Sequence, residues 1–143
     1  ILIDPQDPAL VARPVSPYEM VLVAPRTHPL SRKRRVSLAD IAKHPFISYT
    51  KDTETRQLID QPFENDRLKI SVRMALGSTD LIITYVGLGY GISIIHDLNI
   101  DEANREHLYV RPLRRYYRRQ YIHVVYKSEE GLSRVSRAFL DLL

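Results

Sequence analysis

The chain has 143 residues, 44% of them hydrophobic and 27% charged, a balance typical of folded globular proteins rather than disordered ones. No apolar run approaches the roughly 20 residues that span a bilayer, and residues 1–4 lack the basic start of a secretion signal. The absence of cysteine excludes disulfides and thiolate catalysis. We therefore expect a cytoplasmic protein, present here as a fragment, whose net charge of +4 favours anionic partners.

The first half of the chain alternates extended and helical patterns. In chain order it predicts an irregular extended segment at 1–17, a strand at 18–24, a helix at 37–43 and a strand at 46–49. Residues 50–55 then offer several oxygen caps, and a helical pattern follows them. Ser37-Leu-Ala-Asp40 has the pattern of a capping box, which predicts a helix start at that position. Pro62 removes a helical hydrogen bond, so we expect the second helix to kink or restart there.

The second half continues the alternation. It predicts a half-exposed strand at 68–74, a helix at 78–86 and a strand at 92–95. A polar helix or loop at 98–107, strands at 108–113 and 120–127, and a helix from 133 follow. Gly87 is expected to end its helix in the left-handed conformation. Both faces of strand 120–127 are largely apolar, which predicts a place in the middle of a sheet. The alternation as a whole predicts an α/β fold with mixed, mostly parallel sheets.

Two groups of hydroxyl residues follow strands and begin helices. Ser48, Thr50 and Thr53 form one group, and Ser78 and Thr79 form the other. Ligands of open α/β sheets bind beyond the carboxyl ends of the strands, and helix N-termini attract anions. These residues therefore predict a pocket for a small anion. The alternative interpretation is that they are ordinary N-caps, because serine and threonine are preferred there whatever the function.

The glycines of residues 87–91 do not indicate a dinucleotide site. A dinucleotide fingerprint runs from strand to glycine turn to helix. Here the glycines follow a helix and precede a strand, so an anion is expected at the helix start, Ser78 and Thr79.

Basic residues gather at 32–35 and 111–119, the second group interleaved with Tyr116 and Tyr117. Solvated loops are one interpretation of these runs. A nucleic-acid contact with tyrosines stacking on bases is the other.

No motif indicates catalysis. The five histidines form no metal-binding pair, no serine lies in a G-x-S-x-G elbow, and no acid/base pair is visible. We expect no metal, no cofactor and no enzymatic activity.

Four segments in order resemble the effector-binding domain of LysR-type transcriptional regulators. They are Val21-Leu-Val-Ala-Pro-Arg-Thr-His-Pro-Leu30, Val36-Ser-Leu-Ala-Asp-Ile-Ala42, Pro45-Phe-Ile-Ser48 and Ile83-Thr-Tyr-Val-Gly-Leu-Gly-Tyr-Gly-Ile92. Together they are specific and cover nearly the whole chain. Thr84-Tyr-Val and Ser48-Tyr-Thr50 are most similar to the sulfur-assimilation branch.

This resemblance implies a type II periplasmic-binding-protein-like fold, in which two α/β lobes clasp a small effector. Residues 1–25 would be a remnant of the first lobe, 26–113 the second lobe, and 114–143 the return strand and last helix of the first. Burial of residues 18–24 and of the last helix is expected to need the missing part of the first lobe. The resemblance also implies homodimers or homotetramers, with DNA contacted only by an N-terminal winged helix outside this chain.

The resemblance assigns Ser48 and Thr50 to the pocket and adds Thr84, a hydroxyl that touches the anion in the sulfur branch. His96 and Pro62 depart from the family pattern, so the effector's identity does not carry over. The leading hypothesis is an effector-sensing domain of a transcription regulator. The alternatives are a free-standing anion-binding protein of the same fold and, third, a basic nucleic-acid-binding domain.

Overall fold

The computed structural model describes residues 10–128 and 130–143. The chain forms two compact units: Glu19–Arg119 is the larger, and the segment up to Tyr18 together with Gln120–Leu143 is the smaller. These limits differ from the predicted boundaries at residues 25 and 113, because residues 20–25 pair with strands of the larger unit. The correspondence of the units to lobes of a complete protein stays a prediction.

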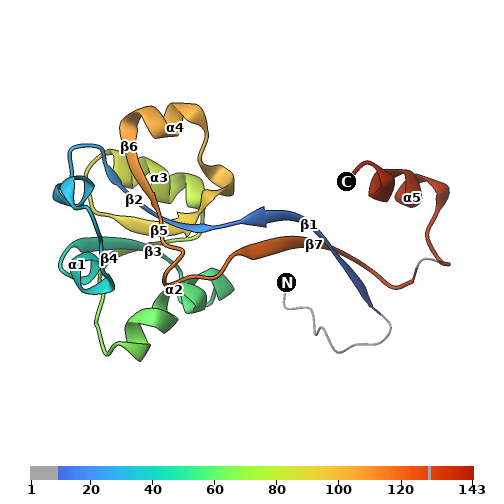
Figure 1. Ribbon diagram of the computed structural model, residues 1–143, viewed down its shortest axis with the longest axis horizontal. Coiled ribbons are helices and arrows are strands. Elements are labelled where there is room, and N and C mark those ends of the chain that lie inside the picture. The colour runs from blue at the N-terminus through green and yellow to red at the C-terminus, as the bar shows by residue number, and fades with distance from the viewer. Residues whose placement is uncertain (1–9, 129) are drawn as a thin grey trace. The chain divides into compact units, whose positions relative to one another are not determined.

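The centre of the larger unit is strand β2 (Met20–Pro25), which pairs antiparallel with β5 (Ser93–His96) and β6 (Leu108–Pro112). In Figure 1 the blue strand β2 lies between β5 and β6. The side chains of residues 20–24 are at most 2% exposed. The expectation that their burial needs further chain is therefore wrong, since neighbours within this unit cover them.

A parallel pair, β3 (Pro45–Tyr49) and β4 (Ser71–Leu76), lies next to this sheet. The Ile47 amide donates to the Ile92 carbonyl at 2.8 Å, and the Ile92 amide donates to the Pro45 carbonyl at 2.9 Å. β4 begins and ends later than predicted but is half exposed, as predicted. The sheets are mixed as predicted. However, three of the four strand pairings in the described residues are antiparallel, so the expectation of mostly parallel sheets is wrong.

The helices of the larger unit are α1 (Leu38–Ala42), α2 (Glu54–Asn65), α3 (Thr79–Gly87) and α4 (Glu102–His107). Two short 3-10 turns, η1 (Pro29–Arg32) and η2 (Asp97–Asn99), complete the set. The predicted capping box starts α1: the Asp40 amide donates to the Ser37 hydroxyl, and the Ser37 amide donates to the Asp40 carboxylate. Helix α2 runs through Pro62 without a restart, because Ile59 and Phe63 on either side of it are both buried in the core.

The turn after α3 differs from the prediction. α3 includes Gly87, its C-cap is Leu88, and the left-handed residue is Gly89, with a φ of +84°. Gly91 is required for a different reason: a Cβ there would lie 2.7 Å from the Pro45 carbonyl oxygen. The glycines of this segment therefore end a helix and bring a strand close to β3.

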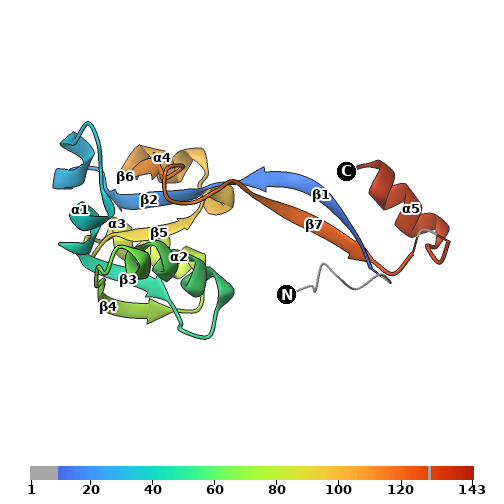
Figure 2. The ribbon, with the colours of Figure 1, turned by 60° about the horizontal axis from the view of Figure 1, so that its bottom comes forward.

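The smaller unit contains an antiparallel ribbon of β1 (Val11–Tyr18) and β7 (Gln120–Tyr126), which Figure 2 shows side by side. From Val11 onward, the segment predicted to be irregular is thus a strand, while residues 1–9 of that prediction lie outside the described residues. Its prolines are accommodated by an irregular register between Pro14 and Ser16 and by the open edges of a two-stranded ribbon. For the same reason, β7 is not in the middle of a sheet in the described residues, contrary to the prediction.

Helix α5 (Arg134–Asp141) has Ser133 as its N-cap, so it starts near Ser133, as predicted. Its predicted apolar face is exposed: Val135 is 80% and Phe139 54% accessible. The residue that packs is Leu140, whose carbonyl accepts a hydrogen bond from Arg13 Nη1 at 3.2 Å. None of the described helices is long and apolar enough to cross a membrane.

Candidate functional site

The parallel register of β3 and β4 brings five of the six predicted site residues to one edge. Tyr49, at the end of β3, is the register partner of Leu76, at the end of β4. The Thr50 amide donates to the Leu76 carbonyl at 3.2 Å. Both strands therefore end together, and the starts of α2 and α3 follow there. We call this set the hydroxyl edge: Ser48, Thr50, Thr53, Ser78 and Thr79.

Tyr49 connects the two halves of the hydroxyl edge. Its hydroxyl is 2.9 Å from Thr79 Oγ1, joining the end of β3 to the first residue of α3. The ring is buried, and this burial raises the pKa of Tyr49 above its usual value, so the phenol stays protonated. Sequence reasoning missed Tyr49 because an aromatic residue in an apolar strand resembles an ordinary core residue.

Arg56 is a buried cation one turn into α2. Its Nη1 donates to the Tyr49 carbonyl at 3.1 Å, and its Nε lies 2.7 Å from Asp60 Oδ2. Arg56 therefore connects α2 to the end of β3 immediately behind the hydroxyl edge. Sequence reasoning missed this residue too, although an Arg and an Asp four residues apart in a helix are a recognisable pair.

The hydroxyls differ in how they are used. Thr53 is an ordinary N-cap: its Oγ1 accepts from the Arg56 amide at 3.2 Å and donates to the Thr50 carbonyl at 2.9 Å. Ser48 Oγ is fully buried and has no hydrogen-bond partner in the part of the chain that the structure describes. Ser78 is the N-cap of α3 but makes no capping hydrogen bond with its side chain. Neither Ser48 nor Ser78 therefore acts as an ordinary N-cap through its side chain.

Thr84, the sixth predicted residue, lies elsewhere on α3. Its Oγ1 donates to the Asp80 carbonyl at 2.8 Å, and its side chain is exposed. Five residues separate it from Thr79, which at 3.6 residues per turn is about 140° around the helix. The structure therefore does not bring Thr84 to the hydroxyl edge.

The chemistry available at the edge is hydrogen-bond donation. Hydroxyls and the free amides of two helix N-termini favour an anion or another acceptor-rich group. Glu54 and Asp80 occupy the first turns of α2 and α3 and oppose that preference. Among the described residues there is no group of three or more His, Asp or Glu placed to hold a metal ion.

The predicted base-stacking pair is not available as a pair. Tyr117 is buried, and its hydroxyl donates to the Ile59 carbonyl at 2.9 Å. Burial, followed by the charge of Asp60, raises the pKa of Tyr117 well above its usual value. Tyr117 is a core residue, so only Tyr116 could contact a ligand.

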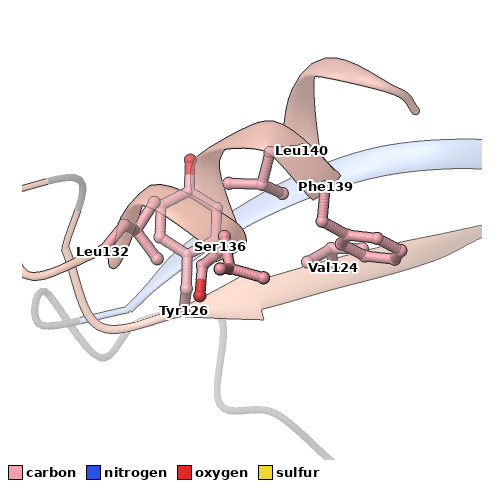
Figure 3. A pocket seen from close by; sticks show the side chains of 7 residues that line it. Val124, Tyr126, Leu132, Ser136, Phe139 and Leu140 are labelled. Atoms are coloured by element: carbon pink, nitrogen blue, oxygen red, sulfur yellow. The ribbon is translucent and has the colours of Figure 1, made fainter.

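An apolar hollow of about 430 Å³ lies between β7 and α5 in the smaller unit, and Figure 3 shows its lining side chains. Val124 and Tyr126 come from β7, and Phe139 and Leu140 from α5. It offers almost no polar groups, so it lacks the chemistry expected of an anion site.

The fold is that of small-molecule-sensing regulatory domains. The cofactor-binding domain of the Cbl transcriptional regulator superimposes with a TM-score of 0.81 at 29% identity, over 96% of this chain and 60% of that one. The regulatory domain of Synechocystis PCC6803 CcmR in complex with 2-PG superimposes with a TM-score of 0.82 at 23% identity, over 99% of this chain and 69% of that one.

The family model described as the LysR substrate binding domain matches residues 1–143, so the chain belongs to this family, as its motifs predicted. The transcriptional activator CmpR of Synechocystis is 29% identical over 126 residues, 87% of this chain and 41% of that protein. The regulator Cbl of Escherichia coli K12 is 34% identical over 102 residues, which are 71% of this chain and 32% of that protein. The chain thus spans less than half the length of these relatives and corresponds to the effector-binding part of LysR-type regulators.

Proposed function

We propose that this domain binds a small anionic effector at the hydroxyl edge and releases it chemically unchanged. The observation that carries the proposal is a pair of hydroxyls, the buried and unpartnered Ser48 near the end of β3 and Ser78 at the N-cap of α3. A buried hydroxyl without a partner costs free energy, which a ligand that accepts its hydrogen bond recovers. The related CcmR regulatory domain was solved in complex with 2-PG, which supports a ligand-binding role.

The full assignment keeps all six predicted residues, but for different reasons. Ser48 and Ser78 donate to the anion, Thr50 and Thr79 complete the lining, and Thr53 holds the start of α2. Thr84 enters only through the family resemblance, since its hydroxyl is bonded to its own helix.

In the complete protein, effector binding would shift a conformational equilibrium and so change transcription. An effector can shift that equilibrium only by binding one conformation better than the other. We propose that the regulator is a cytoplasmic homodimer or homotetramer and that its DNA contacts come from a winged helix outside this chain.

Calorimetric titration tests the site. The probes are sulfate, phosphate and 2-PG, each at constant ionic strength. Ser48→Ala and Ser78→Ala should each weaken the best probe by about tenfold, the value of one hydrogen bond to a charged group. Ser71→Ala, at the opposite end of β4, is the matched control and should change nothing. Equal affinity of the parent chain and both edge variants would contradict the proposal.

Thr84→Ala tests the one site residue that was assigned by the family resemblance alone, separately from those found at the hydroxyl edge. A loss of affinity would support the residue carried over from the family, and unchanged affinity would remove Thr84 from the site. Either result leaves the test of Ser48 and Ser78 intact.

A further inference from the structure

Four arginines line one hollow in the larger unit, away from the hydroxyl edge. Arg34 and Arg35 come from the loop before α1, Arg111 from β6, and Arg115 from the segment that follows β6. The hollow has a volume of about 430 Å³, and Val36, Pro112, Leu113 and Tyr116 complete its lining. It shares no residue with the hydroxyl edge. We call it the arginine hollow.

Among residues 10–128 and 130–143, no carboxylate forms an ion pair with any of these four arginines. The residues that line the hollow include no Asp or Glu. Neighbouring basic residues are paired: Lys33 with Asp40, and both Arg114 and Arg119 with Glu19. The ion pairs of the described chain include none made by the hollow's arginines. Several positive charges around one concave surface raise the local potential and attract anions.

One of the guanidinium groups is held by hydrogen bonds, and a second lies near an aromatic ring. Arg111 donates from Nη1 to the Lys33 carbonyl at 2.9 Å and from Nη2 to the Arg34 carbonyl at 2.6 Å, which fixes the basic loop against β6. The Arg115 guanidinium lies 5.8 Å from the centroid of the Tyr116 ring. Groups that are ordered before a ligand arrives lose less entropy on binding.

The residue type indicates the ligand. All four positions are arginine, whose planar fork binds phosphate oxygens in pairs and whose charge does not titrate. A volume of about 430 Å³ lies in the range of small-molecule sites, about 300–1,000 Å³, and a single sulfate or phosphate would fill little of it. We propose that the arginine hollow is a second anion site, which binds a compact polyphosphate, free or carried on a small molecule.

Calorimetric titration of the full chain with inorganic triphosphate tests this site. At equal ionic strength, triphosphate should bind at least about tenfold more tightly than sulfate, because it reaches several guanidinium groups at once. Arg34→Ala with Arg35→Ala should weaken triphosphate by about tenfold or more. Arg115→Ala, outside the loop, should weaken it in the same direction. Both variants spare the hydroxyl edge, so they do not test the proposed function.

The matched control is Lys69→Ala with Arg73→Ala, which removes the same charge from the region of β4. It should change triphosphate affinity by less than about threefold, since only long-range electrostatics is altered. Arg34→Lys with Arg35→Lys keeps the charge and should still weaken binding, because lysine lacks the fork. Far-ultraviolet circular dichroism identifies any variant that fails to fold.

Three results would overturn the proposal. They are triphosphate affinity no higher than that of sulfate, equal losses in the alanine and control variants, and binding to a short duplex DNA without measurable binding to triphosphate. The last result would make the arginine hollow a DNA-backbone contact instead.

Discussion

Ser48 and Thr53 are both small hydroxyl residues near the same strand end, yet the structure uses them in opposite ways. Thr53 caps α2, so Thr53→Ala should lower the free energy of unfolding by about 1 kcal/mol. Ser48 is buried without a partner, so Ser48→Ala should leave stability unchanged or raise it by up to about 1 kcal/mol. Urea unfolding of both variants measures the difference. A larger loss for Ser48→Ala than for Thr53→Ala would show that the Ser48 hydroxyl is bonded in the folded state.

His28 should make stability depend on pH. Its Nδ1 accepts a hydrogen bond from the Leu30 amide at 3.2 Å, which requires a neutral ring, and the His44 ring lies 4.5 Å away. Burial, and then the nearby His44, lower the pKa of His28 below its ordinary value of 6.5. The unfolded chain therefore binds the proton first, and stability falls as the pH drops through about 6.5 and below.

The variant His28→Asn keeps an acceptor at this cap without a titrating group. Urea midpoints at pH 8 and pH 5.5 should differ less for this variant than for the parent chain. The same pH dependence in both would show that His28 does not contribute to it.

Among the elements, α3 gives a test of whether the effector is an anion. Asp80 lies in the first turn of α3, where its carboxylate opposes an anion at the helix start. Asp80→Asn should tighten binding of sulfate or phosphate severalfold and leave a neutral probe unaffected. Thr84 would keep its hydrogen bond, which uses the backbone carbonyl of residue 80. Weaker anion binding in this variant would contradict the proposed role of the helix start.

The connection between α3 and β5 gives a second test among the elements, that of the close approach of Gly91 to β3. Gly91→Ala would place a Cβ 2.7 Å from the Pro45 carbonyl oxygen, so we expect a loss of about 1–3 kcal/mol. Gly77→Ala is the matched control, because a Cβ there would meet no atom within 4 Å. Thermal or urea unfolding compares the two. Equal stability of both variants would show that β3 can move away from this segment.

Elements defined by local chemistry were predictable, and those defined by distant partners were not. The capping box at Ser37 predicted α1, because its hydrogen bonds join residues three apart. The pairing of β7 with β1 joins the two ends of the described chain, and no local pattern indicates it. Pro62 does not restart the helix, because its buried neighbours override a single lost hydrogen bond. Gly87 misled the prediction because another glycine two positions later takes the left-handed turn.

At the scale of the whole molecule, the sequence predicted the edge at which the hydroxyl residues gather, but not the bonds between them. Five of the six hydroxyl residues gather there because two parallel strands end in register. The bonds made by Tyr49 and Arg56 depend on that register and on how α2 lies against β3. The sixth residue, Thr84, was taken from a family motif, and its place on the exposed side of α3 could not be inferred from that motif.

The larger unit carries both proposed anion sites, which use different chemistry. The hydroxyl edge offers neutral donors and helix starts, suited to one small anion. The arginine hollow offers three arginine forks beside Arg111, which holds the basic loop against β6, an arrangement suited to several linked phosphates. Sulfate should therefore prefer the first site and triphosphate the second.

Amide chemical-shift mapping tests the central claim most directly. The labelled chain is titrated with sulfate at constant ionic strength, and the position of each amide signal is followed. We predict that the largest shifts fall on residues 48–54 and 77–80, and that Ser48→Ala reduces them. Shifts confined to the arginine hollow, or no saturable shift at the hydroxyl edge with sulfate, phosphate or 2-PG, would contradict the account.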